Sequence, residues 1–142
     1  CYYNRAGART PMQWDDGPNA GFSSASAESL YLPIDPSPDR VTVAAQRDDP
    51  DSTVNLVRRL IRLRRQHRVL GALDDAEVLS EGYPFAYLRG GTHLVVLNPR
   101  REAATFALRG AIVAGDLLSD GVAVVDDAIE LRGFGYGVFV VE

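Results

Sequence analysis

The second half of the chain alternates apolar and polar residues with a period of two, which is the pattern of half-buried β-strands. Turn-forming residues separate the apolar runs, and Gly90-Gly91 is the strongest hairpin signal among them. The pattern predicts seven short strands, over residues 77–80, 85–89, 93–97, 105–108, 121–125, 129–131 and 138–141. We interpret Gly133 to Gly137 as a turn between the last two. Such strands with tight turns predict an antiparallel β-sandwich.

A period of three to four residues predicts one long helix over residues 51–67. Asp49 or Asp51 is expected to cap its first turn, and Gly71 is a natural terminator. Apolar residues recur on one face of the predicted helix: Val54, Val57, Leu60 and Ile61, with Leu56 and Leu63 widening that face. At 1.5 Å per residue the helix is about 24 Å long, enough to pack along one side of a barrel or sheet.

Residues 1–50 lack a regular period and are rich in Pro, Gly, Ser and Asp. Proline removes backbone donors and holds the residue before it in an extended conformation, so no long helix fits in this segment. Long irregular segments are unusual in a free-standing domain but common as functional loops of a larger fold. We therefore expect residues 1–50 to be such loops.

The composition argues against a membrane-spanning protein and against a general nucleic-acid-binding protein. The 142 residues are 46% hydrophobic and 24% charged, and no apolar run approaches the roughly 20 residues of a membrane-spanning helix. All 15 basic residues are Arg, yet the formal charge is −4, which disfavours a general affinity for nucleic acid. The six Arg residues between 58 and 68 are accordingly interpreted as a solvated helix face.

The cysteine and histidine residues do not indicate a disulfide framework, a metal site or a catalytic group. A single cysteine, Cys1, excludes an internal disulfide framework and a Cys-rich metal site. Because residue 1 is Cys and not Met, we expect the chain to begin inside a longer product or after processing. His93 lies in a predicted strand without an evident partner and is interpreted as structural. The acidic run 48–51 lacks the ligand spacing of a calcium loop, so capping is the favoured role.

The densest group of unusual residues is Arg9-Thr10-Pro11-Met12-Gln13-Trp14-Asp15-Asp16, followed by Asn19-Ala20-Gly21-Phe22. An Arg fork can bind paired sugar hydroxyls and a Trp face can stack on a sugar ring, so the chemistry suggests a carbohydrate site. The alternative is structural: Trp14 in a core, Asp15 and Asp16 in a turn, and Arg9 paired with a carboxylate.

The same residues resemble the late-barrel segment of the α-amylase superfamily of glycoside hydrolases (glycoside hydrolase family 13). The similarity is closest to its oligo-1,6-glucosidase, α-glucosidase and trehalose synthase branch. It continues through Leu32-Pro33-Ile34-Asp35-Pro36, the segment 43–46, the helix ending near 65 and the last strand near 131–139. The string from Arg9 to Asp15 is the specific part of the resemblance.

The resemblance implies an α+β chain in two parts. Residues 1–72 would be the C-terminal end of a catalytic (β/α)8 TIM barrel, a loop plus the final helix, and 73–142 an all-β antiparallel C-terminal sandwich domain. Barrel enzymes place their sites on loops at the carboxyl ends of strands. The resemblance gives Arg9 the role of binding the non-reducing-end glucose, with Met12, Trp14 and Asp15 supporting the loop.

The parent would be a retaining α-glucosidase-type enzyme that acts on terminal α-1,4 or α-1,6 glucosidic bonds of short oligosaccharides. Its partners would be a glucose-containing oligosaccharide and the remainder of the barrel, without nucleic acid, membrane, metal or cofactor, and in the cytoplasm. The family's catalytic carboxylates lie upstream, so the chain alone is expected to be inactive. The rival hypothesis is a non-catalytic β-sandwich that binds carbohydrate or another protein.

Overall fold

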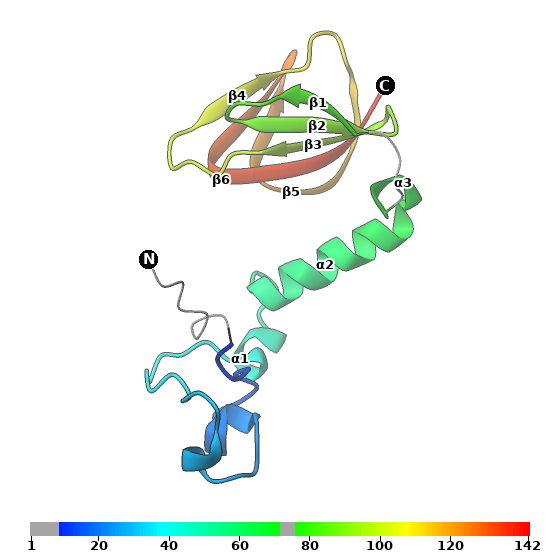
Figure 1. Cartoon of the computed structure of the whole chain (residues 1–142). Coiled ribbons are helices and arrows are strands. Elements are labelled where there is room, and N and C mark those ends of the chain that lie inside the picture. The colour runs from blue at the N-terminus through cyan, green and yellow to red at the C-terminus, as the bar shows by residue number, and fades with distance from the viewer. Residues whose placement is uncertain (1–8, 72–75) are drawn as a thin grey trace. The chain divides into compact units, whose positions relative to one another are not determined.

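A computed structural model describes residues 9–71 and 76–142, and the chain divides into two compact units, Cys1–Ile61 and Arg62–Glu142. The boundary between the units falls inside the long helix. The helices are α1 (Val43–Arg47), α2 (Thr53–Gln66) and α3 (Arg68–Gly71). The strands are β1 (Ala76–Ser80), β2 (Phe85–Arg89), β3 (His93–Leu97), β4 (Ala104–Ala107), β5 (Val113–Val125) and β6 (Ala128–Val141), as Figure 1 shows.

The first unit is irregular up to α1, which confirms that no long helix forms in the described part of the first 50 residues. Between residue 9 and α1, the structure has two single 3-10 turns, Pro18–Gly21 and Ala27–Ser29. The buried Thr42 caps α1, since its hydroxyl accepts a hydrogen bond from the Ala45 N–H at 3.2 Å. The short α1 ends at Arg47, and residues 48–52 connect it to α2.

Helix α2 is confirmed, but neither Asp49 nor Asp51 caps it. Ser52 does, because its hydroxyl accepts the Asn55 N–H at 3.3 Å and donates to the Gln46 carbonyl at 2.7 Å. Asp49 accepts the Asp51 N–H at 2.9 Å instead, which closes a turn before the helix. The buried hydroxyl of Ser52 therefore joins the end of α1 to the start of α2, a contact that the local sequence does not reveal.

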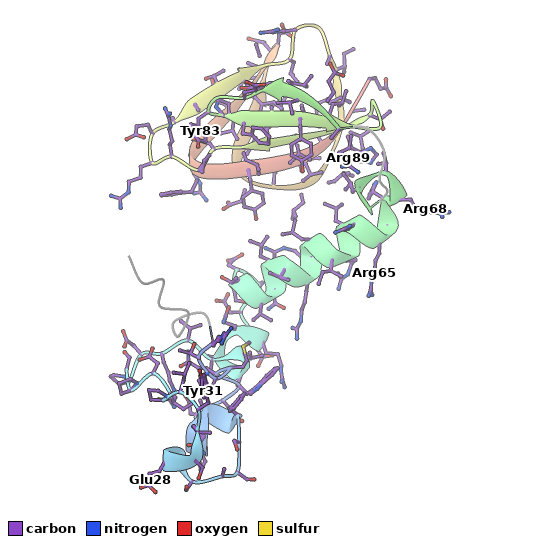
Figure 2. The ribbon with its side chains drawn as sticks, viewed as in Figure 1. Glu28, Tyr31, Arg65, Arg68, Tyr83 and Arg89 are labelled. Carbon is purple, nitrogen blue, oxygen red and sulfur yellow. The ribbon has the colours of Figure 1, made fainter. Side chains whose placement is uncertain are left out.

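The arginine side chains of α2 and α3 are exposed, as predicted for a solvated face, with one exception. Arg59 is half-buried and donates to the Pro50 carbonyl. Arg58 donates to the Asn55 side-chain oxygen at 3.0 Å. Arg65 and Arg68 are both labelled in Figure 2, where Arg68 points outward from α3.

The second unit is built on one antiparallel six-stranded sheet with the order β1-β2-β3-β6-β4, and β5 pairs along β6. Gly90 and Gly91, both with positive φ, form the predicted hairpin between β2 and β3. The long β6 pairs with β4 over its first residues, Ala128 to Leu131, and with β3 over residues 136–140. Because β6 changes partners along its length, the two layers expected of a sandwich belong to one continuous, curled sheet (Figure 1).

Gly133 to Gly137 is not a turn, because these residues lie inside β6 and join the predicted strands 129–131 and 138–141 into one. A Cβ on Gly133 would lie 2.0 Å from the Arg101 carbonyl oxygen, so the backbones pass too closely for a side chain. Between the glycines, Phe134 takes a positive φ of 63°. The glycines thus lie in β6 where that strand changes partner. The predicted strand 121–125 is also part of a longer strand, because it forms the end of β5.

The core lies inside the curled sheet and is formed by side chains from β2, β3 and β6, together with Leu108, which directly follows β4. Its buried members are Ala86, Leu94, Val96, Leu108, Ile129, Leu131, Phe139 and Val141. Val95 and Val138 point to the opposite face, where Leu63 from the last turns of α2 packs against them. Among the described residues, no helix is long and apolar enough to cross a membrane.

His93 has hydrogen-bond partners that the sequence did not reveal, which fits its interpretation as a structural histidine. Its Nε2 lies 3.0 Å from Nδ1 of His67, which follows α2, and its Nδ1 lies 2.9 Å from the Thr92 hydroxyl. Burial lowers the pKa of His93, and the neighbouring His67 lowers this pKa further. Arg89 donates a hydrogen bond to the Val69 carbonyl at 3.4 Å. Figure 2 shows Arg89 at the end of the sheet beside α3 and Tyr83 at the opposite end.

Candidate functional site

The segment from Gln13 to Asp15 is held from two sides by backbone hydrogen bonds. The first N–H groups of α1, from Val43 and Ala44, donate to the carbonyls of Gln13 and Trp14 at 2.9 Å each. On the other side, the N–H groups of Trp14 and Asp15 donate to the Ala20 carbonyl at 2.8 and 3.2 Å. The helix start thereby gains acceptors for N–H groups that have no partner within the helix.

Asp15 shapes the turn that follows this segment. Its carboxylate accepts the Gly17 N–H at 2.8 Å and lies against the backbone of Gly21. A Cβ on Gly21 would lie 2.5 Å from the carboxylate, and Gly21 has a φ of +68°. Both the space and the backbone conformation therefore require glycine at this position.

Asp15 and the adjacent Asp16 do not form a carboxylate pair. Asp16 is exposed and forms a long ion pair with the Arg40 guanidinium at 3.8 Å. The two carboxylates thus have different partners and point to different surroundings. They carry no acid–base function that the geometry supports.

Arg9, Met12 and Trp14 lie on the surface of the first unit. Arg9 is exposed, and Met12 and Trp14 each keep 49% of their surface accessible. Trp14 is therefore not a core residue of this unit, which contradicts the structural alternative for it. The apolar Met12 and Trp14 leave an exposed surface beside the loop, and the roles of Arg9, Met12, Trp14 and Asp15 stay predictions.

The roles of two further residues of this unit, Asn19 and Arg40, were not predicted from the sequence. The Asn19 side chain donates to the carbonyls of Ser23 at 3.0 Å and Ala25 at 2.7 Å, and Asn19 has a φ of 52°. The Asn-Ala-Gly order was a usable signal, because Asn tolerates this left-handed conformation better than most residues. Arg40 has a buried Nε without a hydrogen-bond partner, which no local pattern reveals.

Comparison with known proteins identifies the family. The model of the α-amylase catalytic domain matches residues 3–72. An oligo-1,6-glucosidase from Parageobacillus thermoglucosidasius is 34% identical over 137 residues, which are 92% of this chain and 24% of the relative. The chain belongs to the α-amylase family.

Further relatives are also enzymes named for their action on sugars. A trehalose synthase/amylase from Mycobacterium tuberculosis is 44% identical over 110 residues, 69% of this chain and 18% of that protein. The crystal structure of trehalulose synthase MutB from Pseudomonas mesoacidophila matches with a TM-score of 0.85 at 28% identity, covering 98% of this chain and 26% of that one. A mutant of MutB has been solved with its substrate sucrose.

The chain spans about a quarter or less of the length of these relatives. The predicted resemblance to the α-amylase family is confirmed, as is an antiparallel β-domain in the second half of the chain. In the described residues, no group of three or more His, Cys, Asp or Glu side chains is arranged to hold a metal ion.

Proposed function

We propose that this chain is the C-terminal portion of a retaining α-glucosidase-type enzyme. Residues 1–72 would be the end of its catalytic barrel and residues 73–142 its C-terminal β domain. The parent would act on terminal α-1,4 or α-1,6 glucosidic bonds of short oligosaccharides, in the cytoplasm. The names of its relatives support this substrate class, since they include an oligo-1,6-glucosidase and a glucan 1,6-alpha-glucosidase.

The observation that carries the proposal is the braced segment that follows Arg9. Backbone hydrogen bonds to Ala20 and to the start of α1 hold Gln13 to Asp15 in place. The chain that leads back to Arg9 therefore starts from a fixed position. A guanidinium offers several N–H donors in a planar fork, which suits two neighbouring sugar hydroxyls. We propose that Arg9 binds the terminal glucose, with Met12, Trp14 and Asp15 supporting its loop.

Helix α2 supports the proposal that the remainder of a barrel packs against the first unit. Val57, Leu60 and Ile61 form an apolar stripe on α2, yet each is 41–48% exposed. A contiguous apolar surface of this kind usually marks a packing or interaction site. The remaining barrel would cover this stripe in the parent.

The catalytic carboxylates would lie in that remaining barrel. A retaining mechanism uses a nucleophile and a general acid about 5–5.5 Å apart across the scissile bond. Asp15 and Asp16 are adjacent in sequence and have separate partners, so they do not supply this pair. We propose that the chain alone is inactive, which an assay of the purified chain on maltose and isomaltose checks directly.

Replacement of Arg9 by Ala in the full-length gene product tests the proposed function. We expect a higher KM and a lower turnover on maltose or isomaltose, with kcat/KM reduced about tenfold or more, because a charge-assisted hydrogen bond to substrate is lost. Arg47→Ala is the matched control, since Arg47 is also exposed but lies outside the braced segment. Unchanged kinetics in Arg9→Ala would remove the assigned role, and a parent inactive on both sugars would refute the proposed function.

A further inference from the structure

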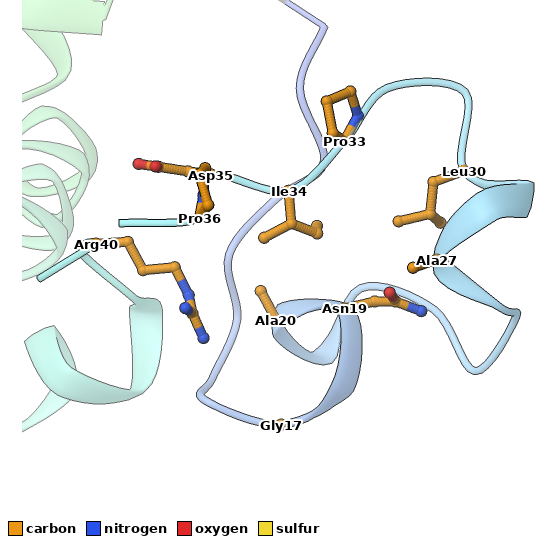
Figure 3. A pocket seen from close by; sticks show the side chains of 10 residues that line it. All are labelled: Gly17, Asn19, Ala20, Ala27, Leu30, Pro33, Ile34, Asp35, Pro36 and Arg40. Carbon is orange, nitrogen blue, oxygen red and sulfur yellow. The ribbon is translucent and has the colours of Figure 1, made fainter. Parts of the chain in front are cut away.

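A pocket of about 360 Å³ lies in the first unit, between the Pro18–Gly21 turn and the segment that leads to α1. This volume is within the range of pockets that bind small molecules. In Figure 3, Arg40 and Asp35 lie on one side of the pocket, and Ala27 and Leu30 lie on the other. Neither Arg9 nor Trp14 lines the pocket, so it is separate from the proposed glucose site.

The polar groups of the pocket have hydrogen-bonding capacity left over. The Arg40 side chain is only 20% exposed, and its buried Nε has no partner. Its ion pair with Asp16 is long, at 3.8 Å, and the Asp16 side chain is 86% exposed. The guanidinium carries further N–H donors on its two Nη atoms, and the one long ion pair leaves such donors for a ligand.

Two of the residues that line the pocket, Asp35 and Asn19, carry side-chain acceptors. The Asp35 carboxylate accepts the Ser37 N–H at 2.9 Å, which fixes the carboxylate at the edge of the pocket. The amide nitrogen of Asn19 is used by the Ser23 and Ala25 carbonyls, which leaves its carbonyl oxygen as the acceptor. The pocket therefore offers both donors and acceptors to a ligand.

The rest of the lining is apolar. Its side chains come from Ala20, Ala27, Leu30, Pro33, Ile34 and Pro36. In Figure 3, Ile34 and Ala20 lie between the polar side and the Leu30 side. A ligand that fits must combine hydroxyl groups, which both accept and donate, with a flat apolar face.

We propose that this pocket is a second saccharide site, in which Arg40 donates to sugar hydroxyls, Asp35 accepts from them, and the apolar wall contacts the face of the ring. A neutral sugar suits the pocket better than an anion, because Asp35 and the neighbouring Asp16 would repel a negative charge. The site differs from the proposed glucose site at Arg9 and does not depend on it.

Titration of the 142-residue chain with maltose, followed by amide chemical shifts, tests the proposal. We expect saturable shifts at Gly17, Ala20 and Ile34, and binding weakened about tenfold or more in Arg40→Met, which keeps the apolar stem but removes the donors. Asp35→Asn should weaken maltose binding as well. Arg47→Met is the matched control and should bind like the unchanged chain, because Arg47 does not line the pocket.

The variants also separate this proposal from the first. Arg9→Ala should leave these shifts and the affinity unchanged, whereas shifts confined to residues near Arg9 would overturn the second site. The proposal would also be overturned if Arg40→Met and Asp35→Asn bound maltose as tightly as the unchanged chain. The absence of any saturable shift with maltose would overturn it too. Tight binding of sulfate at the same amides would assign the pocket to anions instead. Circular dichroism of each variant confirms that the comparison is between folded chains.

Discussion

At the residue scale, Asp15 shows how one carboxylate fixes a loop. It accepts the Gly17 N–H and occupies the space that a side chain at position 21 would need. Trp14 and Ala20 complete the turn through their backbone groups. Because the loop is closed at its start and at its end, the residues before it have a stable base.

Asp15→Ala is expected to loosen this turn, whereas Asp16→Ala is not. The first change removes a hydrogen bond at 2.8 Å, which contributes about 1 kcal/mol, and the second removes only a long, exposed ion pair. Hydrogen exchange at the Gly17 amide measures the difference. We expect faster exchange in Asp15→Ala alone, and equal exchange in both variants would show that Asp15 does not hold the turn.

At the element scale, the histidine pair links the end of α2 to β3. His67 and His93 are in contact through ring nitrogens at 3.0 Å, so one nitrogen must donate and the other accept. A proton added to the accepting nitrogen would place two donors against each other. The contact therefore requires one neutral imidazole.

We expect acid to weaken the second unit through His93. Because burial and His67 lower the pKa of His93 in the folded protein, the unfolded chain binds the proton more readily. Neutral His93 therefore contributes to the free energy of unfolding above pH 6.5. This contribution is lost as the pH falls through the lowered pKa of His93 in the folded protein.

Urea unfolding at pH 7.5 and 5.5 measures this dependence, because carboxylates titrate mostly below that window. His93→Gln should flatten it. Thr92→Ser keeps a hydroxyl beside His93 and should behave like the unchanged protein. An equal loss of stability between the two pH values in His93→Gln would assign the dependence to other groups.

At the scale of the whole molecule, the two units differ in how they are stabilised. The second unit has a continuous buried core with Phe139 and Ile129 at its centre. The first has few buried residues and depends on backbone and side-chain hydrogen bonds around Thr42 and Ser52. Local opening is cheapest where few apolar contacts must be broken.

Hydrogen exchange over the whole chain should therefore be uneven. We expect the slowest amides in β3 and β6, and much faster exchange in the described part of the first unit up to α1. If the remainder of the proposed barrel packs on α2, its presence should slow exchange along α2, because Val57 and Leu60 would become covered. Uniform protection in the 142-residue chain would contradict this prediction.

Much of the fold and the family could be predicted from the sequence, because those features depend on neighbouring residues. The period of two predicts the strands, the apolar spacing predicts α2, and Gly90-Gly91 predicts the hairpin between β2 and β3. The string from Arg9 to Asp15 is similarly local, so its residues alone indicate the α-amylase family. Its assigned role in binding glucose is still a prediction.

Only the tertiary structure decided the features that join distant residues. The close backbone of Arg101 explains why position 133, inside a strand, is a glycine, and a histidine 26 residues away gives His93 its partner. Ser52 caps α2 while bonding to Gln46, and Arg40 gains its importance from the pocket it lines. Local spacing determines which elements form, whereas the contacts between them depend on how the chain folds back on itself.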